Sequence, residues 1–299
     1  MKKWLLALLA LSLILSLSAC NEPPTESESE SVSESETESE TESETESETA
    51  KEREPVNVYE AFEKKVLEYG DGYTLPYRIY VPDDYSAEKD YPVLMFLHGA
   101  GERGDDNTAQ LLHVIPEFFA DVNSPAYDAI VVCPQCPEGM QWVDTPWAEG
   151  SYNLGETPIS IPMQGVMELL KQIENEYSTD MDRFYAMGIS MGGFGTWDLC
   201  MRNPDLFAAA APICGGADPS EAAVLVNLPI YTVHGDSDST VPVTGTREIV
   251  DAIREKGGEK IHYEEMPGYS HNVWTYAATE ARVDGKLLVE WLFSQVYGN

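Results

Sequence analysis

Basic residues are scarce in this chain of 299 residues, in which 18 Lys and Arg stand against 52 Asp and Glu and the formal net charge is −34. A chain this acidic repels phosphate backbones, which excludes a general DNA- or RNA-binding protein. A wholly disordered protein is excluded too, because 43% of the residues are hydrophobic and can supply a sizeable core.

The sequence signatures of common metal and nucleotide sites are also absent. The chain has no EF-hand loop, phosphate-binding glycine loop or dinucleotide fingerprint. Cys133 and Cys136 have C-x-x-C spacing, but no second pair or histidine cluster completes a zinc site. With Cys200 and Cys214 they could form disulfides in an exported protein, in any of three pairings; we favour buried free thiols. We expect no metal and no cofactor.

Long apolar runs are missing except at the N-terminus. Two lysines precede the run 4–17, which is too short for a comfortable membrane span and is typical of a signal-peptide core. The string LSAC at 17–20 resembles a bacterial lipobox, in which the cysteine becomes the lipidated first residue of the mature protein. We therefore expect residues 1–20 to be a lipoprotein signal peptide and Cys20 to carry lipid. An ordinary signal peptide with an incidental cysteine is the alternative.

An acidic, low-complexity segment follows this cysteine. From Thr25 to Thr49, Ser or Thr alternates with Glu, broken only by Val32. Residues 21–54 hold 14 acidic and 2 basic residues and have no apolar face, so nothing offsets the entropy of ordering them. We interpret them as a disordered tether that displays a domain outside the bacterial membrane. Only the lipid would attach the protein to that membrane.

The remaining residues, 55–299, have the size of one α/β domain. Apolar runs predict two strands around a Gly-Asp-Gly turn, and then strands that alternate with helices. This order is typical of a mostly parallel central sheet with helices on both faces, preceded by an antiparallel hairpin. Strands are expected at 63–69, 73–81, 92–98, 129–133, 183–189, 207–214, 230–234 and 261–266, and helices at 108–120, 161–177, 192–201, 243–256 and 285–296.

The motif G-x-S-x-G occurs at 188–192, GISMG, between a predicted strand and a predicted helix. In a sharp strand-to-helix turn, side chains at Gly188 and Gly192 would collide with backbone, and the turn holds Ser190 in strained geometry with its hydroxyl exposed. We therefore predict Ser190 as a nucleophile. A plain glycine-rich helix start is the alternative.

A serine hydroxyl needs a base to take its proton, and the chain has five histidines. His271 follows the last predicted strand, in a short loop at the sheet edge where a base would lie, and we predict it as that base. His98 and His234 end strands and precede glycine, which favours a structural role in bonding backbone near the site. His113 and His262 have no special context.

The acid that orients the histidine is expected between the serine and the histidine in the chain. The loop HGDSDSTVP at 234–242 offers Asp236 and Asp238. Asp238 is preferred because it lies deeper in the loop, four residues ahead of Pro242, and Asp236 is expected to brace the loop. The acid would accept the Nδ1–H of His271 and stabilise the imidazolium.

Two backbone N–H groups must bind the developing oxyanion. Met191, directly after the nucleophile, should supply one. The other should come from the loop GAGERG at 99–104, with Ala100 as the expected donor and Gly101 as a close rival. In the same loop, Glu102 and Arg103 are interpreted as a pair that shapes the loop.

Two tryptophans, Trp142 and Trp147, lie in the long loop after the predicted strand 129–133. We take them as candidate substrate-binding residues, which could stack on a sugar or on an aromatic acyl group. Covering the edge of the core is the equal alternative.

Six stretches together carry a family resemblance: LHGAGERGDDN (97–107), PQCPEGMQW (134–142), DRFYAMGISMGGFGTWDL (182–199), PDLFAAAAPICGG (204–216), HGDSDSTVP (234–242) and GYSHNVW (268–274). The chain resembles the α/β-hydrolase superfamily. More narrowly, it resembles bacterial esterases grouped with feruloyl and acetyl-xylan esterases, polyhydroxybutyrate-depolymerase-like enzymes and "predicted peptidases" of prolyl-oligopeptidase type. The resemblance implies Ser190, Asp238 and His271 as a triad and Ala100 as oxyanion donor.

The function that the resemblance implies is a serine carboxylesterase with an acyl-enzyme mechanism. Acetyl or feruloyl groups on polysaccharide are the expected substrates, by analogy and from the surface location. A serine peptidase acting on short peptides is the alternative, since the same triad serves both, although the chain has no room for the propeller of prolyl oligopeptidase. A non-catalytic surface binding protein is the third hypothesis.

Overall fold

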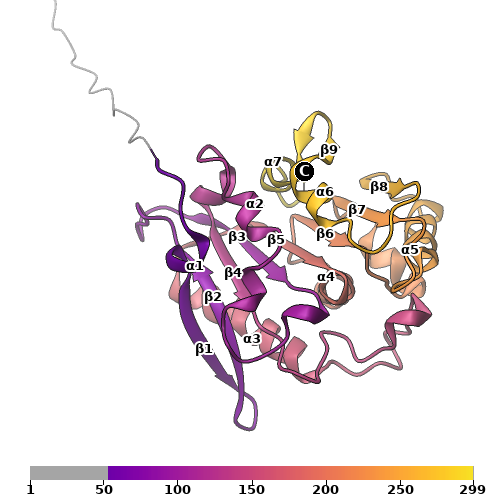
Figure 1. The fold of residues 1–299 in the computed structure, drawn as a ribbon, viewed down its shortest axis with the longest axis horizontal. Coiled ribbons are helices and arrows are strands. Elements are labelled where there is room, and N and C mark those ends of the chain that lie inside the picture. Colours follow the sequence, from indigo (N-terminus) through magenta and orange to yellow (C-terminus); the bar gives the residue numbers. More distant parts are fainter. Residues whose placement is uncertain (1–52, 299) are drawn as a thin grey trace, which may run out of the picture. The chain divides into compact units, whose positions relative to one another are not determined.

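The computed structural model describes residues 53–298, which build an eight-stranded sheet with helices on both faces (Figure 1). The predicted signal peptide at 1–20, the lipidation site Cys20 and the tether up to residue 52 lie outside the described residues. None of the described helices is long and apolar enough to cross a membrane.

The sheet opens with the predicted hairpin and continues as a parallel sheet. β1 (Glu63–Tyr69) pairs antiparallel with β2 (Tyr73–Tyr80), and β2 pairs antiparallel with β4. The other neighbours pair parallel, in the order β1-β2-β4-β3-β5-β6-β7-β8. This confirms the predicted fold class. The parallel strands are β3 (Tyr91–Leu97), β4 (Ile130–Pro134), β5 (Thr179–Ile189), β6 (Ala209–Ile213), β7 (Ile230–Gly235) and β8 (Ile261–Met266).

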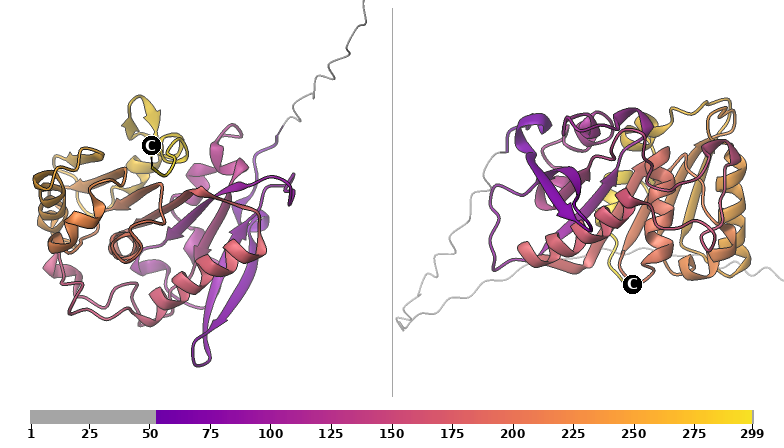
Figure 2. Two further views of the ribbon diagram at one scale, coloured as in Figure 1. Left: turned by 180° about the vertical axis from the view of Figure 1, so that it is seen from behind. Right: turned by 90° about the horizontal axis from the view of Figure 1, so that it is seen from below.

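Alternating side chains of the central strands fill two separate cores. In β3, Leu94 and Phe96 belong to the core on one face, whereas Val93 and Met95 belong to the core on the other. Burial of both faces explains why this strand is an uninterrupted apolar run. The first core is covered by α1 (Val58–Ala61), α2 (Ile115–Phe118), α6 (Trp274–Thr279) and α7 (Leu288–Phe293), and the second by α3 (Ile161–Glu176), α4 (Met191–Arg202) and α5 (Val243–Glu255) (Figure 2).

The continuous helix predicted over 108–120 is wrong. The structure has a 3-10 turn at Ala109–Leu111 and then the short helix α2. Val114, between them, has a φ of +70°, which breaks the helical path. Pro116 explains the break, because it has no N–H to donate and its ring would clash with the preceding turn of a continuous helix.

The helix predicted over 285–296 is also longer than the structure allows. α7 begins at Leu288, after a small hairpin of β9 (Arg282–Val283) and β10 (Lys286–Leu287). Asp284 and Gly285 form its turn with φ angles of +52° and +81°, which match the tight turns that Asp-Gly pairs favour. The short helix α6, which follows the loop of His271, was not expected.

Candidate active site

Ser190 lies at the junction of β5 and α4, where the sequence motif places it. Its backbone has φ +55° and ψ −116°, a conformation that is strained for a residue with a side chain. The N–H of Ser190 donates to the carbonyl of Ile213 in the neighbouring strand, at 2.9 Å. The surrounding chain therefore holds the serine in a conformation that it would not adopt alone.

The two glycines of the motif make room for this turn. A Cβ atom at Gly192 would lie 1.9 Å from the carbonyl oxygen of Leu97, at the end of β3. A Cβ atom at Gly188 would lie 2.3 Å from the carbonyl oxygen of Gly192. Both distances are far below contact, so any side chain here would push the turn away from β3.

The structure brings the three predicted triad residues together. Ser190, Asp238 and His271 follow β5, β7 and β8, and the carboxyl ends of these parallel strands share one edge of the sheet (Figure 1). Nε2 of His271 lies 2.7 Å from Oγ of Ser190, and Nδ1 lies 2.6 Å from Oδ2 of Asp238. One imidazole therefore bridges a hydroxyl and a carboxylate, as general-base activation of a serine requires.

The two candidate aspartates have different surroundings. The side chain of Asp238 is fully buried, and its Oδ1 accepts from the N–H groups of Thr240 and Val241. Burial by itself would raise the pKa of Asp238, but hydrogen bonds from His234, His271 and these N–H groups outweigh it and hold the pKa well below its usual range. Asp236 is exposed and accepts from the N–H of Gly268, so it braces the loop.

The two predicted oxyanion donors flank this serine. Met191 begins α4 and Ala100 begins a 3-10 turn, so neither N–H has an acceptor within its own helix. A Cβ atom at Gly99 would lie 3.7 Å from Cβ of Ser190, which places the loop after β3 directly beside Ser190.

His98 has the structural role expected of it. Its Nδ1 lies 2.6 Å from the carbonyl oxygen of Gly99, and its Nε2 accepts the N–H of Cys136 at 2.9 Å. Burial lowers the pKa of His98 to about 4. A neutral ring suits both contacts, because Nδ1 must donate while Nε2 must accept.

The expectation of substrate contact is wrong for Trp142. Its side chain is fully buried, and its indole N–H donates to the carbonyl of His98 at 3.0 Å. It supports the loop after β3 from inside the core. Trp147 is half-buried, and the guanidinium of Arg103 lies over its ring, 5.6 Å from the centroid. Only Trp147 therefore remains a candidate for contact with substrate.

Sequence reasoning missed a group of side chains beside His271. Trp274, in α6, packs edge-on against the ring of His271, with 5.6 Å between the ring centroids, and its ring is tilted against that of His113, with 5.5 Å between centroids. Nε2 of His113 lies 3.6 Å from a carboxylate oxygen of Glu102. Glu102 and Arg103 thus have different partners, contrary to the pair expected from the sequence. The one feature of the sequence that could have indicated Trp274 as a site residue is its position three residues after His271.

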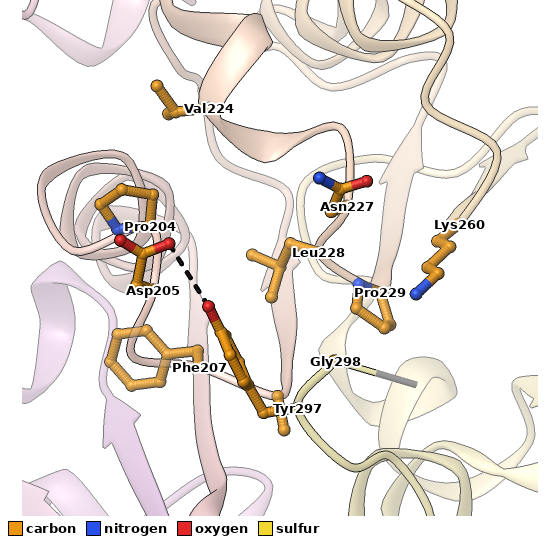
Figure 3. A pocket seen from close by; sticks show the side chains of 11 residues that line it. Pro204, Asp205, Phe207, Val224, Asn227, Leu228, Pro229, Lys260, Tyr297 and Gly298 are labelled. Carbon is orange, nitrogen blue, oxygen red and sulfur yellow. Dashed lines mark hydrogen bonds between the residues drawn. The ribbon is translucent and has the colours of Figure 1, made fainter.

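Other candidates for chemistry are the cysteines, a metal cluster and a cavity. The four cysteines Cys133, Cys136, Cys200 and Cys214 are free and buried. Among residues 53–298, no group of three or more His, Cys, Asp or Glu is arranged to hold a metal. A cavity of about 330 Å³ is lined by Phe207, Leu228 and Tyr297 among others (Figure 3). It lies where β6 and β7 begin, at the sheet edge opposite to Ser190.

Comparison with known proteins assigns the family. A family model described as "Putative esterase" matches residues 72–237, more than half of the chain. The chain belongs to this esterase family. The match contains Ser190 and the loop after β3, and it confirms the resemblance inferred from the sequence.

Individual proteins that are similar to this chain are also named as esterases. It is 28% identical over 167 residues to "Bifunctional acetylxylan esterase/xylanase XynS20E" of Neocallimastix patriciarum, covering 54% of this chain and 21% of the relative. It is 23% identical over 192 residues to "Probable feruloyl esterase C" of Aspergillus oryzae, covering 64% and 65%. A solved "Thermostable Esterase" is 32% identical with a TM-score of 0.69, covering 80% of this chain and 64% of that one. The chain thus spans less than two thirds of each of these proteins.

Proposed function

We propose that this chain is a serine carboxylic-ester hydrolase that removes acetyl or feruloyl groups from polysaccharide. The observation that carries the proposal is the pair of short contacts from Ser190 through His271 to Asp238. Membership of the esterase family supports the reaction, and the similarity to proteins named acetylxylan and feruloyl esterases supports the substrate class.

The reaction proceeds in two halves. Oγ of Ser190 attacks the ester carbonyl carbon while Nε2 of His271 takes its proton, and buried Asp238 stabilises the imidazolium. The N–H groups of Met191 and Ala100 donate to the oxyanion. His271 then protonates the leaving alcohol, which leaves an acyl-serine. Water, deprotonated by His271, attacks the acyl-serine, and the carboxylic acid departs as Ser190 regains its proton.

The proposed location is outside the cytoplasm, with a lipid on Cys20 as the anchor. The string LSAC at 17–20 and the acidic segment 21–54 support this placement. The Cys20→Ala variant should lose metabolic labelling by a fatty acid and should no longer sediment with the membrane fraction. Labelling that persists in this variant would rule out Cys20 as the lipidated residue.

The test of function uses the purified full chain and its Ser190→Ala variant. Both receive feruloylated, acetylated arabinoxylan, and released acetate and ferulate are measured by chromatography. Release by the wild type alone is expected, and the ratio of the two acids then gives the acyl preference. If neither protein releases acid, the polysaccharide assignment fails. Serine-dependent hydrolysis of aminoacyl amides in its place would establish the peptidase alternative.

A further inference from the structure

Arg103 joins three parts of the site with one planar group. Its Nε donates to the carbonyl oxygen of Ala100 at 2.8 Å, and its Nη1 donates to the carbonyl oxygen of Met140 at 3.2 Å. The same guanidinium lies over the ring of Trp147. It therefore connects the loop that carries the expected oxyanion donor to the loop that carries the candidate substrate tryptophan.

Other hydrogen bonds join the bases of these two loops. The side-chain amide of Gln135, which is fully buried, donates to the carbonyl oxygen of Glu102 at 3.1 Å. The N–H of Gly104 donates to the carbonyl oxygen of Cys136 at 3.0 Å. Ala100 lies in the short segment between His98 and the residues that make these two bonds, Glu102 and Gly104. Arg103 is bonded to the backbone of this segment itself, at the carbonyl of Ala100.

The peptide groups on both sides of Ala100 are held by a side chain. His98 binds the carbonyl of Gly99, so the N–H of Ala100, in the same trans peptide group, points away from His98. Arg103 binds the carbonyl of Ala100, so the N–H of Gly101 points away from Arg103. His98 opposes rotation of the first peptide group, which carries the Ala100 N–H, and Arg103 opposes displacement of the Cα atom of Ala100 that the two groups share.

We propose that Arg103 is a positioning residue of the oxyanion hole. It fixes the backbone at Ala100 so that the N–H meets the oxyanion without reorganisation, and it ties this backbone to Trp147. The inference rests on the proposed esterase function. Preorganised donors contribute to catalysis because they need not turn toward the charge as it forms, so a donor that can rotate stabilises the transition state less.

The test compares the full-length wild type with Arg103→Lys and Arg103→Ala. The matched control is Arg183→Lys, because Arg183 pairs with Asp180 in the half of β5 far from Ser190. Active sites are counted by the extent of fluorophosphonate labelling, so misfolded protein does not enter the rates. The measurements are kcat/KM for p-nitrophenyl acetate, inhibition by a boronic acid and inhibition by ferulate.

Both Arg103 variants should lose about 10- to 100-fold in kcat/KM per labelled site, less than the 10²–10³-fold loss that follows complete removal of an oxyanion donor. The boronic acid forms a tetrahedral adduct that places an oxygen in the oxyanion hole, so its inhibition constant should rise by the same factor. Inhibition by ferulate, which has no tetrahedral centre, should change by less than about threefold, because the positioning effect concerns the transition state. The Arg183→Lys variant should match the wild type.

Two results would overturn the inference. One is kcat/KM within about twofold of wild type in Arg103→Ala, and the other is full activity in Arg103→Lys, which would show that positive charge alone suffices. A lysine ammonium lacks the planar fork that reaches two carbonyls, so it cannot replace the geometry. A wild type as inactive as Ser190→Ala would instead refute the proposed function itself.

Discussion

Nε2 of His234 lies 3.1 Å from Oδ2 of Asp238, the same oxygen that lies 2.6 Å from Nδ1 of His271. An ionised carboxylate can only accept hydrogen bonds, so both histidines present an N–H to it. The other ring nitrogen of His234 contacts Oγ1 of Thr246 at 2.7 Å, which fixes the plane of the ring. His234 therefore orients the carboxylate of Asp238, in addition to making the backbone contact with Val241 that its strand-end position suggested.

The two aspartates of this loop should differ sharply on substitution. Asp238→Asn should lower kcat for p-nitrophenyl acetate by about 10³–10⁴-fold, because an amide can offer N–H where His271 needs an acceptor and so favours the wrong tautomer. Asp236→Asn is the matched control and should stay within about threefold of wild type, since Asp236 is exposed and its carboxylate accepts from the hydroxyl of Ser237 and the N–H of Gly268. A larger loss in Asp236→Asn would reverse the assignment.

His98 should make folding stability depend on pH. Its pKa is lowered to about 4 in the fold, so between about pH 6.5 and pH 4 the unfolded chain binds more protons than the folded chain. Stability should therefore fall as pH decreases through this window, by up to about 3 kcal/mol from this group, and no further below it. Urea unfolding of wild type and His98→Gln at pH 7 and pH 4.5 measures the difference. Equal pH dependence in both proteins would contradict the burial effect.

Gly192→Ala should prevent correct packing of the serine turn. The added Cβ would lie 1.9 Å from the carbonyl oxygen of Leu97, which is backbone and cannot move away cheaply. We expect a loss of about 3 kcal/mol or more in the free energy of unfolding, or no folded protein at all. Gly101→Ala is the stability control, because its Cβ meets nothing within 4 Å. Circular dichroism melts of both variants provide the test.

Substitution of the two tryptophans of the long loop should show that Trp142 has a structural role and that Trp147 has a role in substrate binding. Trp142→Ala should lower the free energy of unfolding by about 3–5 kcal/mol, as expected for a fully buried aromatic side chain. Trp147→Ala should destabilise the protein far less and should raise KM for feruloylated arabinoxylan several-fold. Urea melts and steady-state kinetics distinguish these effects. A KM unchanged in Trp147→Ala would remove this residue from the substrate site.

The thiols of residues 53–298 should be inert in the native protein. All four are free and buried, and burial raises the pKa of Cys136, Cys200 and Cys214. Ellman's reagent should therefore detect no thiol before denaturation and four after it. A reducing agent should leave the melting temperature unchanged. Fewer than four thiols would indicate a disulfide, and a fifth would show that Cys20 carries no lipid.

The fold could be predicted well where the pattern is local. The Gly-Asp-Gly turn of the hairpin and the apolar run of β3 follow from short stretches of sequence, because turn residues and burial of both strand faces leave a clear signature. The prediction of one helix over 108–120 is wrong. The apolar residues of this segment are compatible with a helix, but Pro116 and the positive φ of Val114 interrupt the helical backbone. Whether a proline interrupts a helix whose apolar residues are periodic depends on the surface against which the segment packs.

The sequence by itself determined that Ser190 would stand in a tight turn between β5 and α4, because only glycines tolerate the backbone contacts of that turn. The sequence also indicated that the other candidate site residues lie in loops that follow strands. Only the tertiary structure decided which of those side chains meet. Asp238 and His271 lie 33 residues apart, and Arg103 and Trp147 lie 44 apart, so their contacts depend on how the sheet aligns its strand ends. For the same reason, only packing could show that Trp142 is enclosed by the core while Trp147 remains partly open.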